Sequence, residues 1–557
     1  MCLENRCVAL GRENRQGRFD DAMLLVGDRL PIGSTYRLLA EHGGVLFGEE
    51  YFADLFKRSV LGRPTVPARV VATVMLLQAY EGLSDREACD RLAFDLRWKA
   101  AAGLTVDAPS FHPTVLVGMR NRLRGSTGPR RLFDDVNTTA RAVGLLRGRR
   151  RVLDSTPLFD AVATQDTVIQ LRAAIRKVLA VAERVDPALA CVVRAALTRD
   201  DDYAGVGKPP CDWDDPKARE ALVDALVRDA RAALAVLDGR ELAGPLAEAG
   251  ELLELVAGQD VEQGDDGVFR IARRVARDRL ISTVDVEARH GRKSRARTFD
   301  GYKSHLGVDP DDELITAVAV TPANTPDREV IDELLGHHGS GAPVANAIPV
   351  AGEPAADTGT DGGSDSAPDS ESKCFEVYGD SAYADGVTPD EQTAPGHDMR
   401  TKVPPARNAN GYSKDRFTID LAAGTVTCPA QHTVAIRAGL RYRVARFGVL
   451  CGSCPLRAQC TKSRRGRVIS IHPQEAAVQH AKARQQDPAW QQDYRANRPV
   501  VERKISHFTR RPWGGRKARC RGKKRILTDL LTRAGALNLA RLAILGLHQG
   551  PDGWAIA

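Results

Sequence analysis

Two short apolar segments that each run into an aspartate constrain the fold most strongly. Residues 149–162 have the sequence RRRVLDSTPLFDAV, in which Val152 and Leu153 precede Asp154 and a Ser-Thr-Pro turn signal. An apolar pair followed by such a signal predicts a strand that stops at a turn. A second segment, CFEVYGDSAYADG, places Asp380 in the same position. Both acids are therefore predicted at strand ends, where open sheets place catalytic groups.

A third acid lies on a predicted helix. The segment RPVVERKISHF carries Glu502, and its Pro499 suits the first turn of a helix. Val501, Ile505 and Phe508 recur at i, i+4 and i+7, which predicts an apolar stripe that packs on the core. Glu502 follows the first residue of this stripe, so we expect its carboxylate at the edge of the core.

Three such carboxylates are suited to holding two divalent metal ions. Mg²⁺ prefers oxygen ligands and keeps part of its water, so few protein carboxylates suffice. Two-metal phosphoryl chemistry needs carboxylates that converge on ions about 4 Å apart. Asp154, Asp380 and Glu502 meet this need if one sheet and a flanking helix bring them together. The simpler alternative for the helix is a surface ion pair between Glu502 and Arg498.

The charge balance favours a polyanionic partner. The 557-residue chain has a net charge of +8 and should divide into several domains. Its basic residues cluster in RRPWGGRKARCRGKKR (510–525), a run that would neutralise phosphates unless it is only a solvated tail. No apolar run approaches the roughly 20 residues that span a bilayer. The N-terminal segment shows no export signal, so we expect a cytoplasmic protein.

The N-terminal region is predicted to be helical. Residues 66–80 form an apolar helix, and Ser84 and Glu87 form a capping box at the start of the next. A break and a basic helix, TVLVGMRNRL, follow. A helix-turn-helix DNA reader and a plain helical bundle with solvated arginines are about equally favoured.

A strand pair is predicted in the middle of the chain. The basic segment HGRKSRARTFDGYKSHLGVD precedes the apolar segment ELITAVAVTPANTPD. Because strand side chains alternate between faces, Lys303 and His305 are expected on one face.

The cysteines predict a structural metal site. Four of the 11 cysteines, Cys428, Cys451, Cys454 and Cys460, lie close together in the sequence. Cys451 and Cys454 have the C-x₂-C spacing with which two thiolates bind one Zn²⁺. Cys460 and Cys428 would complete the site, with His432 as a substitute ligand. The alternative is a set of reduced free thiols.

The order of these motifs resembles that of the DDE transposases of bacterial insertion sequences, in the branch with a Tyr-Arg-Glu signature. The matching segments are VLDSTPLFDAVATQDT, EARHGRKSRARTFDGYKSHLGVD, TPANTPD, YGDSAYADG, YRANRPVVERKISHF and RKARCRGKKR. They lie within residues 149–541, so the resemblance covers most of the chain.

The resemblance implies an α/β fold with a ribonuclease-H-like mixed sheet flanked by helices. It implies that Asp154, Asp380 and Glu502 are catalytic and bind two Mg²⁺ (or Mn²⁺) ions, and that Tyr494 and Arg498 contact element-end DNA. The tyrosine lies eight residues before the glutamate, one more than in the commonest spacing, and Thr509 replaces a usual lysine. Further DNA contacts are expected from Lys303, His305, Arg510, Arg511, Arg516, Lys517 and Arg519.

The pattern and the resemblance together divide the chain into eight parts. They are an N-terminal helical, DNA-binding region (1–145), a first core part (146–167), a helical insertion (168–275), core strands (276–338), a disordered linker (339–373), a core part with the second Asp (374–404), a β-rich, candidate zinc-binding insertion (405–472) and a C-terminal helical core part (473–557).

The expected activity is transposition. The protein would bind the terminal inverted repeats of its element, cut the strands with metal-activated water and join the 3′-ends to target DNA. We expect a homodimer on double-stranded DNA, associated with the nucleoid when active. The alternatives are an inactive DNA-binding regulator and a metal-dependent nuclease of the same fold that lacks strand transfer.

Overall fold

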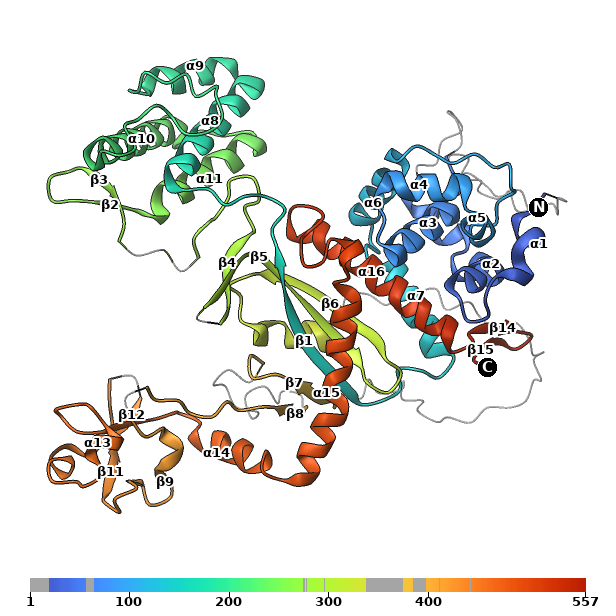
Figure 1. The fold of residues 1–557 in the computed structure, drawn as a ribbon. Coiled ribbons are helices and arrows are strands. Elements are labelled where there is room, and N and C mark those ends of the chain that lie inside the picture. Colours follow the sequence, from blue (N-terminus) through green and yellow to red (C-terminus); the bar gives the residue numbers. More distant parts are fainter. Residues whose placement is uncertain are drawn as a thin grey trace, which may run out of the picture.

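The computed structural model describes residues 20–56, 65–273, 276, 278–294, 296–336, 374–383, 397–409, 411–440 and 442–557. Helical layers pack around a central mixed sheet, which makes the fold α/β, as predicted (Figure 1). The predicted linker at 339–373 lies outside these residues. Among the helices that the structure describes, none has the length and apolar character to cross a membrane.

The central sheet has six strands. Its strands are β1 (Arg150–Phe159), β4 (Arg289–Ser294), β5 (Arg297–Asp309), β6 (Leu314–Pro322), β7 (Glu376–Gly379) and β8 (Asp398–Thr401). β1 pairs antiparallel with β5 on one side and parallel with β7 on the other, and β8 continues parallel to β7. Both β4 and β6 pair with β5, one after the other along its length.

The prediction that Asp154 ends a strand is wrong. β1 continues to Phe159, because residues 152–159 pair in register with residues 301–308 of β5. β7 pairs with β1 only as far as Val152. Beyond that point β1 has one strand partner among the described residues, and such an edge tolerates Pro157. Asp154 therefore lies just past the point where β7 leaves β1.

The second predicted strand ends where expected, since Asp380 directly follows β7. The strand pair in the middle of the chain is also confirmed as β5 and β6. Gly307 pairs with Ala317 and Val308 with Ile315, so Thr316 of β6 is the extra residue of a bulge in this pair. α12 (Ile331–Leu335) follows β6 after a short 3₁₀ turn.

In the part of the chain that the structure describes, seven α-helices precede the sheet: α1 (Ala22–Val26), α2 (Thr35–Leu46), α3 (Ala68–Glu81), α4 (Asp85–Phe94), α5 (Leu96–Ala101), α6 (Thr114–Gly125) and α7 (Arg131–Ala142). The predicted apolar helix is α3, and both hydrogen bonds of the Ser84–Glu87 capping box are present. Of the arginines on α6, Arg120 forms an ion pair with Asp85 of α4. Helices α2 to α7 share one core with the C-terminal half of α16 (Lys523–Ile544), whereas α1 packs on α5 in a separate small cluster.

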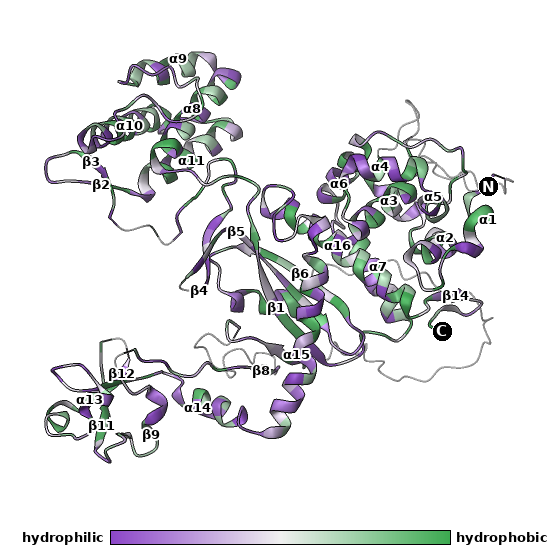
Figure 2. Cartoon of the chain, in the orientation of Figure 1, coloured by the Kyte–Doolittle hydropathy of each residue, from purple (hydrophilic) through white to green (hydrophobic). Residues whose placement is uncertain are grey.

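Helix α15 (Pro488–Phe508) crosses the sheet and carries the third acid (Figure 1). The prediction that Pro499 occupies its first turn is wrong. Asp487 caps the helix, and Pro488 takes the first position, so Pro499 lies in the interior. The apolar stripe of Val501, Ile505 and Phe508 is confirmed by its burial. Figure 2 shows hydrophobic residues in parts of the central strands, whereas β4 and the first half of α15 are largely hydrophilic.

Two groups of elements extend from this core. Between β1 and β4 lie α8 (Thr167–Val185), α9 (Pro187–Ala196), α10 (Pro216–Leu237), α11 (Gly244–Gln259) and the hairpin of β2 (Val261–Gln263) and β3 (Phe269–Ile271). Between β8 and α14 (Glu475–Arg484) lie β9 (Thr418–Asp420), β10 (Thr425–Thr427), β11 (Thr433–Arg437), β12 (Arg443–Arg446), α13 (Arg457–Cys460) and β13 (Val468–Ile471). A hairpin of β14 (His548–Gly550) and β15 (Gly553–Ala555) ends the chain.

A buried amide joins α16, α7 and β6 at the bulge. Asn538 accepts a hydrogen bond from the backbone N–H of Ile315 (2.8 Å) and donates to its carbonyl (2.7 Å). Asn538 also donates to Oδ1 of Asn137 (2.8 Å). Both backbone groups of Ile315 are thereby satisfied where the strand ladder is interrupted.

Replacing this amide should destabilise the protein strongly. Asn538→Leu leaves the buried N–H of Ile315 without its partner, so the free energy of unfolding should fall by about 2–4 kcal/mol. Urea unfolding measures this change. The control is Asn121→Leu on α6, where the side chain is exposed and the change should stay within about 0.5 kcal/mol. Equal effects of the two substitutions would contradict the role of Asn538.

Candidate active site

One open cavity of about 550 Å³ is lined by all three predicted acids. Asp154 comes from β1, Asp380 from the residue after β7, and Glu502 from α15. The cavity forms where β7 leaves β1, so that both faces of β1 border it. Asp154 lies on the face that α15 covers, while the neighbouring Ser155 points to the opposite face.

Arg498 is the immediate partner of Asp154. Its Nη2 lies 3.0 Å from Oδ2 of Asp154, and both side chains are largely buried. Arg498 also donates to the carbonyl of Leu153 (3.4 Å). Burial raises the pKa of Asp154; Arg498 opposes this rise, and the nearby charge of Asp380 adds to it. The site therefore holds two acids close enough to repel each other and one cation that neutralises the buried one.

Tyr494 fixes the start of α15 to the end of β7. Its hydroxyl donates to the carbonyl of Gly379 (2.9 Å), the residue before Asp380. The ring stacks on Trp490 at a centroid distance of 5.0 Å, and the ammonium of Lys402 lies over it at 4.7 Å. Tyr494 is buried, and its hydroxyl is engaged in the hydrogen bond to Gly379. In this arrangement the side chain positions the helix beside Asp380.

Asp327 is a fourth acid of the cavity that the sequence pattern did not single out. Nζ of Lys303 lies 2.6 Å from its Oδ1, and the hydroxyl of Ser155 donates to its Oδ2 (2.5 Å). Lys303 also donates to the carbonyl of Thr325 (2.8 Å). The segment TPANTPD contains Asp327, but nothing in its spacing shows that the chain returns to β1 at this point. The structure thus gives Lys303 an acidic partner inside the protein.

The prediction that His305 contacts DNA does not fit the structure. His305 and Lys303 do share a face of β5, as predicted, but the imidazole of His305 is fully buried. One ring nitrogen lies 2.9 Å from the hydroxyl of Thr321 and the other 3.4 Å from that of Tyr383. Burial lowers the pKa of His305 to about 4, so the ring is neutral near pH 7.

The basic run after α15 is held against the end of β1. The backbone N–H of Phe159 donates to the carbonyl of Arg516 (2.7 Å), and that of Ala518 donates to the carbonyl of Phe159 (2.8 Å). This contact places the run on the strand that carries Asp154. The predicted DNA-contacting side chains of the run are all exposed; they are Arg510, Arg511, Arg516, Lys517 and Arg519.

The donors in the cavity suit a hard divalent cation, since Asp154, Asp380 and Glu502 offer only oxygen. As the side chains stand, no three His, Cys, Asp or Glu residues of the described chain are grouped closely enough to hold an ion. In the cavity, one oxygen of Asp154 is paired with Arg498, and Glu502 is exposed. Ion binding would thus require rearrangement of these side chains.

Two family models match the chain. The model described as "Transposase DDE domain" matches residues 427–543, from β10 to α16, and so includes Glu502. The model described as "Transposase domain (DUF772)" matches residues 27–122, the N-terminal helices. Neither a curated protein nor a solved structure matches the chain. The segments with Asp154 and Asp380 lie between the two matched regions.

Breaking the pair of Asp327 and Lys303 should destabilise the wall of the cavity. Asp327→Ala leaves the largely buried ammonium of Lys303 without its charge partner, which should lower the free energy of unfolding by about 3 kcal/mol. Urea unfolding provides the measurement. Asp332→Ala on α12 removes an exposed carboxylate and serves as the control. If the two variants unfold at the same urea concentration, the buried pair does not stabilise this wall.

Proposed function

Because the chain belongs to the DDE transposases of insertion sequences, we propose that it binds the terminal inverted repeats of its element, cuts the DNA there and joins the 3′-ends to target DNA. The observation that carries this proposal is the convergence of Asp154, Asp380 and Glu502 on one cavity from three separate elements. The Tyr-Arg-Glu branch is part of the proposal and rests on Tyr494 and Arg498, which line the same cavity.

Asp154, Asp380 and Glu502 would hold two Mg²⁺ (or Mn²⁺) ions. When bound, such ions activate the attacking water or 3′-hydroxyl and stabilise the leaving oxygen. Until then Arg498 offsets the charge of the buried Asp154. Lys303 does the same for Asp327 on the opposite face of β1, which keeps the strand in place. Asp327 and Arg498 are thus proposed as positioning residues.

The sheet is proposed to be a ribonuclease-H-like core. Its order is β6-β5-β1-β7-β8, with β5 antiparallel to β1 and with β7 and β8 parallel to it. This mixed arrangement, with α15 across one face, supports the assignment. Because β1 and β7 are neighbours in this sheet and α15 crosses it, acids from distant parts of the sequence reach one cavity.

DNA would approach the cavity along exposed cations. Arg292 and Lys293 of β4 line its mouth, and the run at 510–525 lies at the end of β1. These side chains would contact phosphates and position the DNA without reading its sequence. An element has two ends, and each chain has one set of three acids, so we expect a homodimer on DNA. In a bacterial cell this activity belongs to the cytoplasm and its nucleoid.

The direct test uses the full chain, Mg²⁺ and double-stranded DNA that carries the native element ends. Mapping of the cleaved bonds and detection of joined products decide between the candidate activities. Cleavage at the ends together with strand transfer supports the transposase. Cleavage without transfer indicates a nuclease of the same fold, and binding without cleavage indicates a DNA-binding regulator.

Removal of any one of the three acids should abolish the reaction. Asp154→Asn, Asp380→Asn and Glu502→Gln each remove a proposed metal ligand, which should lower the cleavage rate about a thousandfold or more. Binding of the element ends should change little, because no phosphate contact is removed. The exposed Asp332→Asn is the control and should cleave normally. Full Mg²⁺-dependent cleavage by a variant would exclude that residue from the site.

A further inference from the structure

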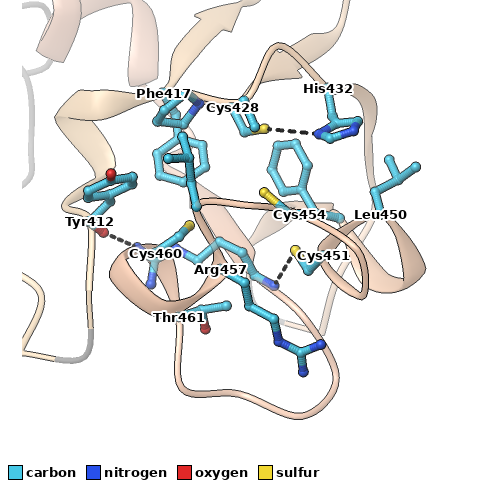
Figure 3. A pocket seen from close by; sticks show the side chains of 15 residues that line it. Tyr412, Phe417, Cys428, His432, Leu450, Cys451, Cys454, Arg457, Cys460 and Thr461 are labelled. Carbon is cyan, nitrogen blue, oxygen red and sulfur yellow. Dashed lines mark hydrogen bonds between the residues drawn. The ribbon is translucent and has the colours of Figure 1, made fainter.

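The β-rich insertion (residues 405–472) gathers its four cysteines around one small cavity. Cys428, Cys451, Cys454 and Cys460 all line it, although more than 20 residues of sequence separate the first from the second (Figure 3). The cavity measures about 20 Å³. That volume is close to the size of a single water molecule and too small for a substrate. Any occupant must therefore be about the size of one atom.

This insertion has little core of its own. Among its described residues, the hydrophobic cluster contains eight buried side chains, and two of these are Cys451 and Cys460. The helical insertion at α8 to α11, by contrast, buries 26 residues in its cluster. A five-stranded sheet with so small a core usually needs a disulfide or a metal ion to be stable. The described cysteines form no disulfide.

Two of the four thiols have polar contacts within the insertion. The backbone N–H of Arg467 donates to Sγ of Cys451 at 3.4 Å, the type of outer contact that supports a bound thiolate. Sγ of Cys428 lies 3.8 Å from Nδ1 of His432. A cation that binds the thiolates would remove the cost of burying them.

We propose that Cys428, Cys451, Cys454 and Cys460 bind one structural Zn²⁺ ion in this cavity. Four thiolates around one point suit Zn²⁺ in tetrahedral coordination, and a closed set of four leaves no position for catalysis. The thiols reach the ion by rotation of their side chains, because as they stand no three of them are grouped at ligand distance. His432 lies next to Cys428 and can take its place.

Metal analysis of the full-length protein, purified without added metal, tests this site. About one zinc per chain is expected, lost in Cys451→Ser and in wild-type protein treated with a chelator, with a lowered melting temperature in both cases. Cys191→Ser, on the exposed surface of α9, is the control and should keep its zinc. Co²⁺ added to chelator-treated wild type should give the absorption of tetrahedral thiolate coordination. Zinc-free protein with four titratable thiols here would overturn the proposal.

A second, independent observation concerns the charge of the same insertion. Residues 405–472 contain ten arginines and two lysines against two aspartates and no glutamate, a net charge of +10. The whole chain has a net charge of only +8. The rest of the chain therefore has a net charge of −2, although it includes the basic run at 510–525.

The sheet of the insertion presents part of this charge on one face. Arg437 of β11 pairs with Val444 of β12, and Arg446 lies two residues further on β12, so both arginines point to the same side. The opposite side carries Val426, Ala445 and the rest of the core. Arg446 also pairs with Val468, close to the loop with three further cations: Lys462, Arg464 and Arg465.

These five side chains form the basic patch: Arg437, Arg446, Lys462, Arg464 and Arg465. All are exposed, and none has an acidic partner within 4.0 Å in the described part of the chain. Elsewhere in the insertion, Lys414 pairs with Glu475 and Lys482 of α14 pairs with Asp415, so the patch differs from its surroundings. Unpaired surface cations of this density suit a polyanion.

We infer that the basic patch contacts the phosphates of double-stranded DNA, an inference that rests on the proposed function and names a surface for it. Such contacts add affinity without reading sequence. The patch should therefore act equally on element ends and on an unrelated duplex. Because the insertion joins the core between β8 and α14, this surface would extend the DNA path beyond the acids.

The test is the salt dependence of DNA binding by the full chain, measured by fluorescence anisotropy on both duplexes. The triple variant Arg437→Gln, Arg446→Gln, Arg464→Gln should bind both about tenfold or more weakly at 0.1 M salt and should lower the slope of log affinity against log salt by about 2–3. The matched control removes three exposed charges from α8 and α10, namely Lys177→Gln, Arg184→Gln, Arg219→Gln.

An unchanged slope in the patch variant, or an equal loss in the control, would overturn the inference. Failure of the proposed function has a different readout, since it would appear as absent cleavage and strand transfer by wild-type protein. The difference between the wild type and the patch variant in binding the unrelated duplex tests the basic patch, whether or not the element ends are cut.

Discussion

The antiparallel pairing of β1 with β5 is the constraint on which the site depends. Eight consecutive residue pairs join the two strands, although the whole helical insertion lies between them in the sequence. The entropy cost of closing so long a loop rises only with the logarithm of its length, so the insertion is tolerated. A slip of one residue would exchange the faces of Asp154 and Ser155 and separate Asp154 from α15.

The two faces of β1 are balanced in charge. Asp154 meets Arg498 on the side of α15, and Ser155 on the other side meets Asp327, which pairs with Lys303. A buried carboxylate without a cation would be costly in the low dielectric of this region. Each pair therefore gives an acid beside the cavity a cation partner before any metal ion is present.

The two insertions are expected to be stabilised in different ways. The helical insertion buries 26 residues in one apolar cluster, and this burial is expected to stabilise it. The β-rich insertion has eight buried residues and four cysteines around one cavity, so its stability is expected to depend on the thiols. The same proposed Zn²⁺ ion would then stabilise the fold that carries the basic patch, so that DNA contact by the patch would depend on the ion.

The sequence by itself determined the local elements of this protein: helix α3, the Ser84–Glu87 capping box, the β5–β6 strand pair and the buried stripe of α15. It also singled out three acids that line one cavity. These features depend on residues near one another in the chain, where periodicity and capping act.

Only the tertiary structure decided that β1 continues past Asp154, because a partner strand, and not the local turn signal, determines where a strand ends. The same holds for Pro499, which lies inside α15 because Asp487 and Pro488 begin the helix earlier. The burial of His305 and the pairing of Asp327 with Lys303 also required the fold, since they join segments whose distance in space no local pattern records.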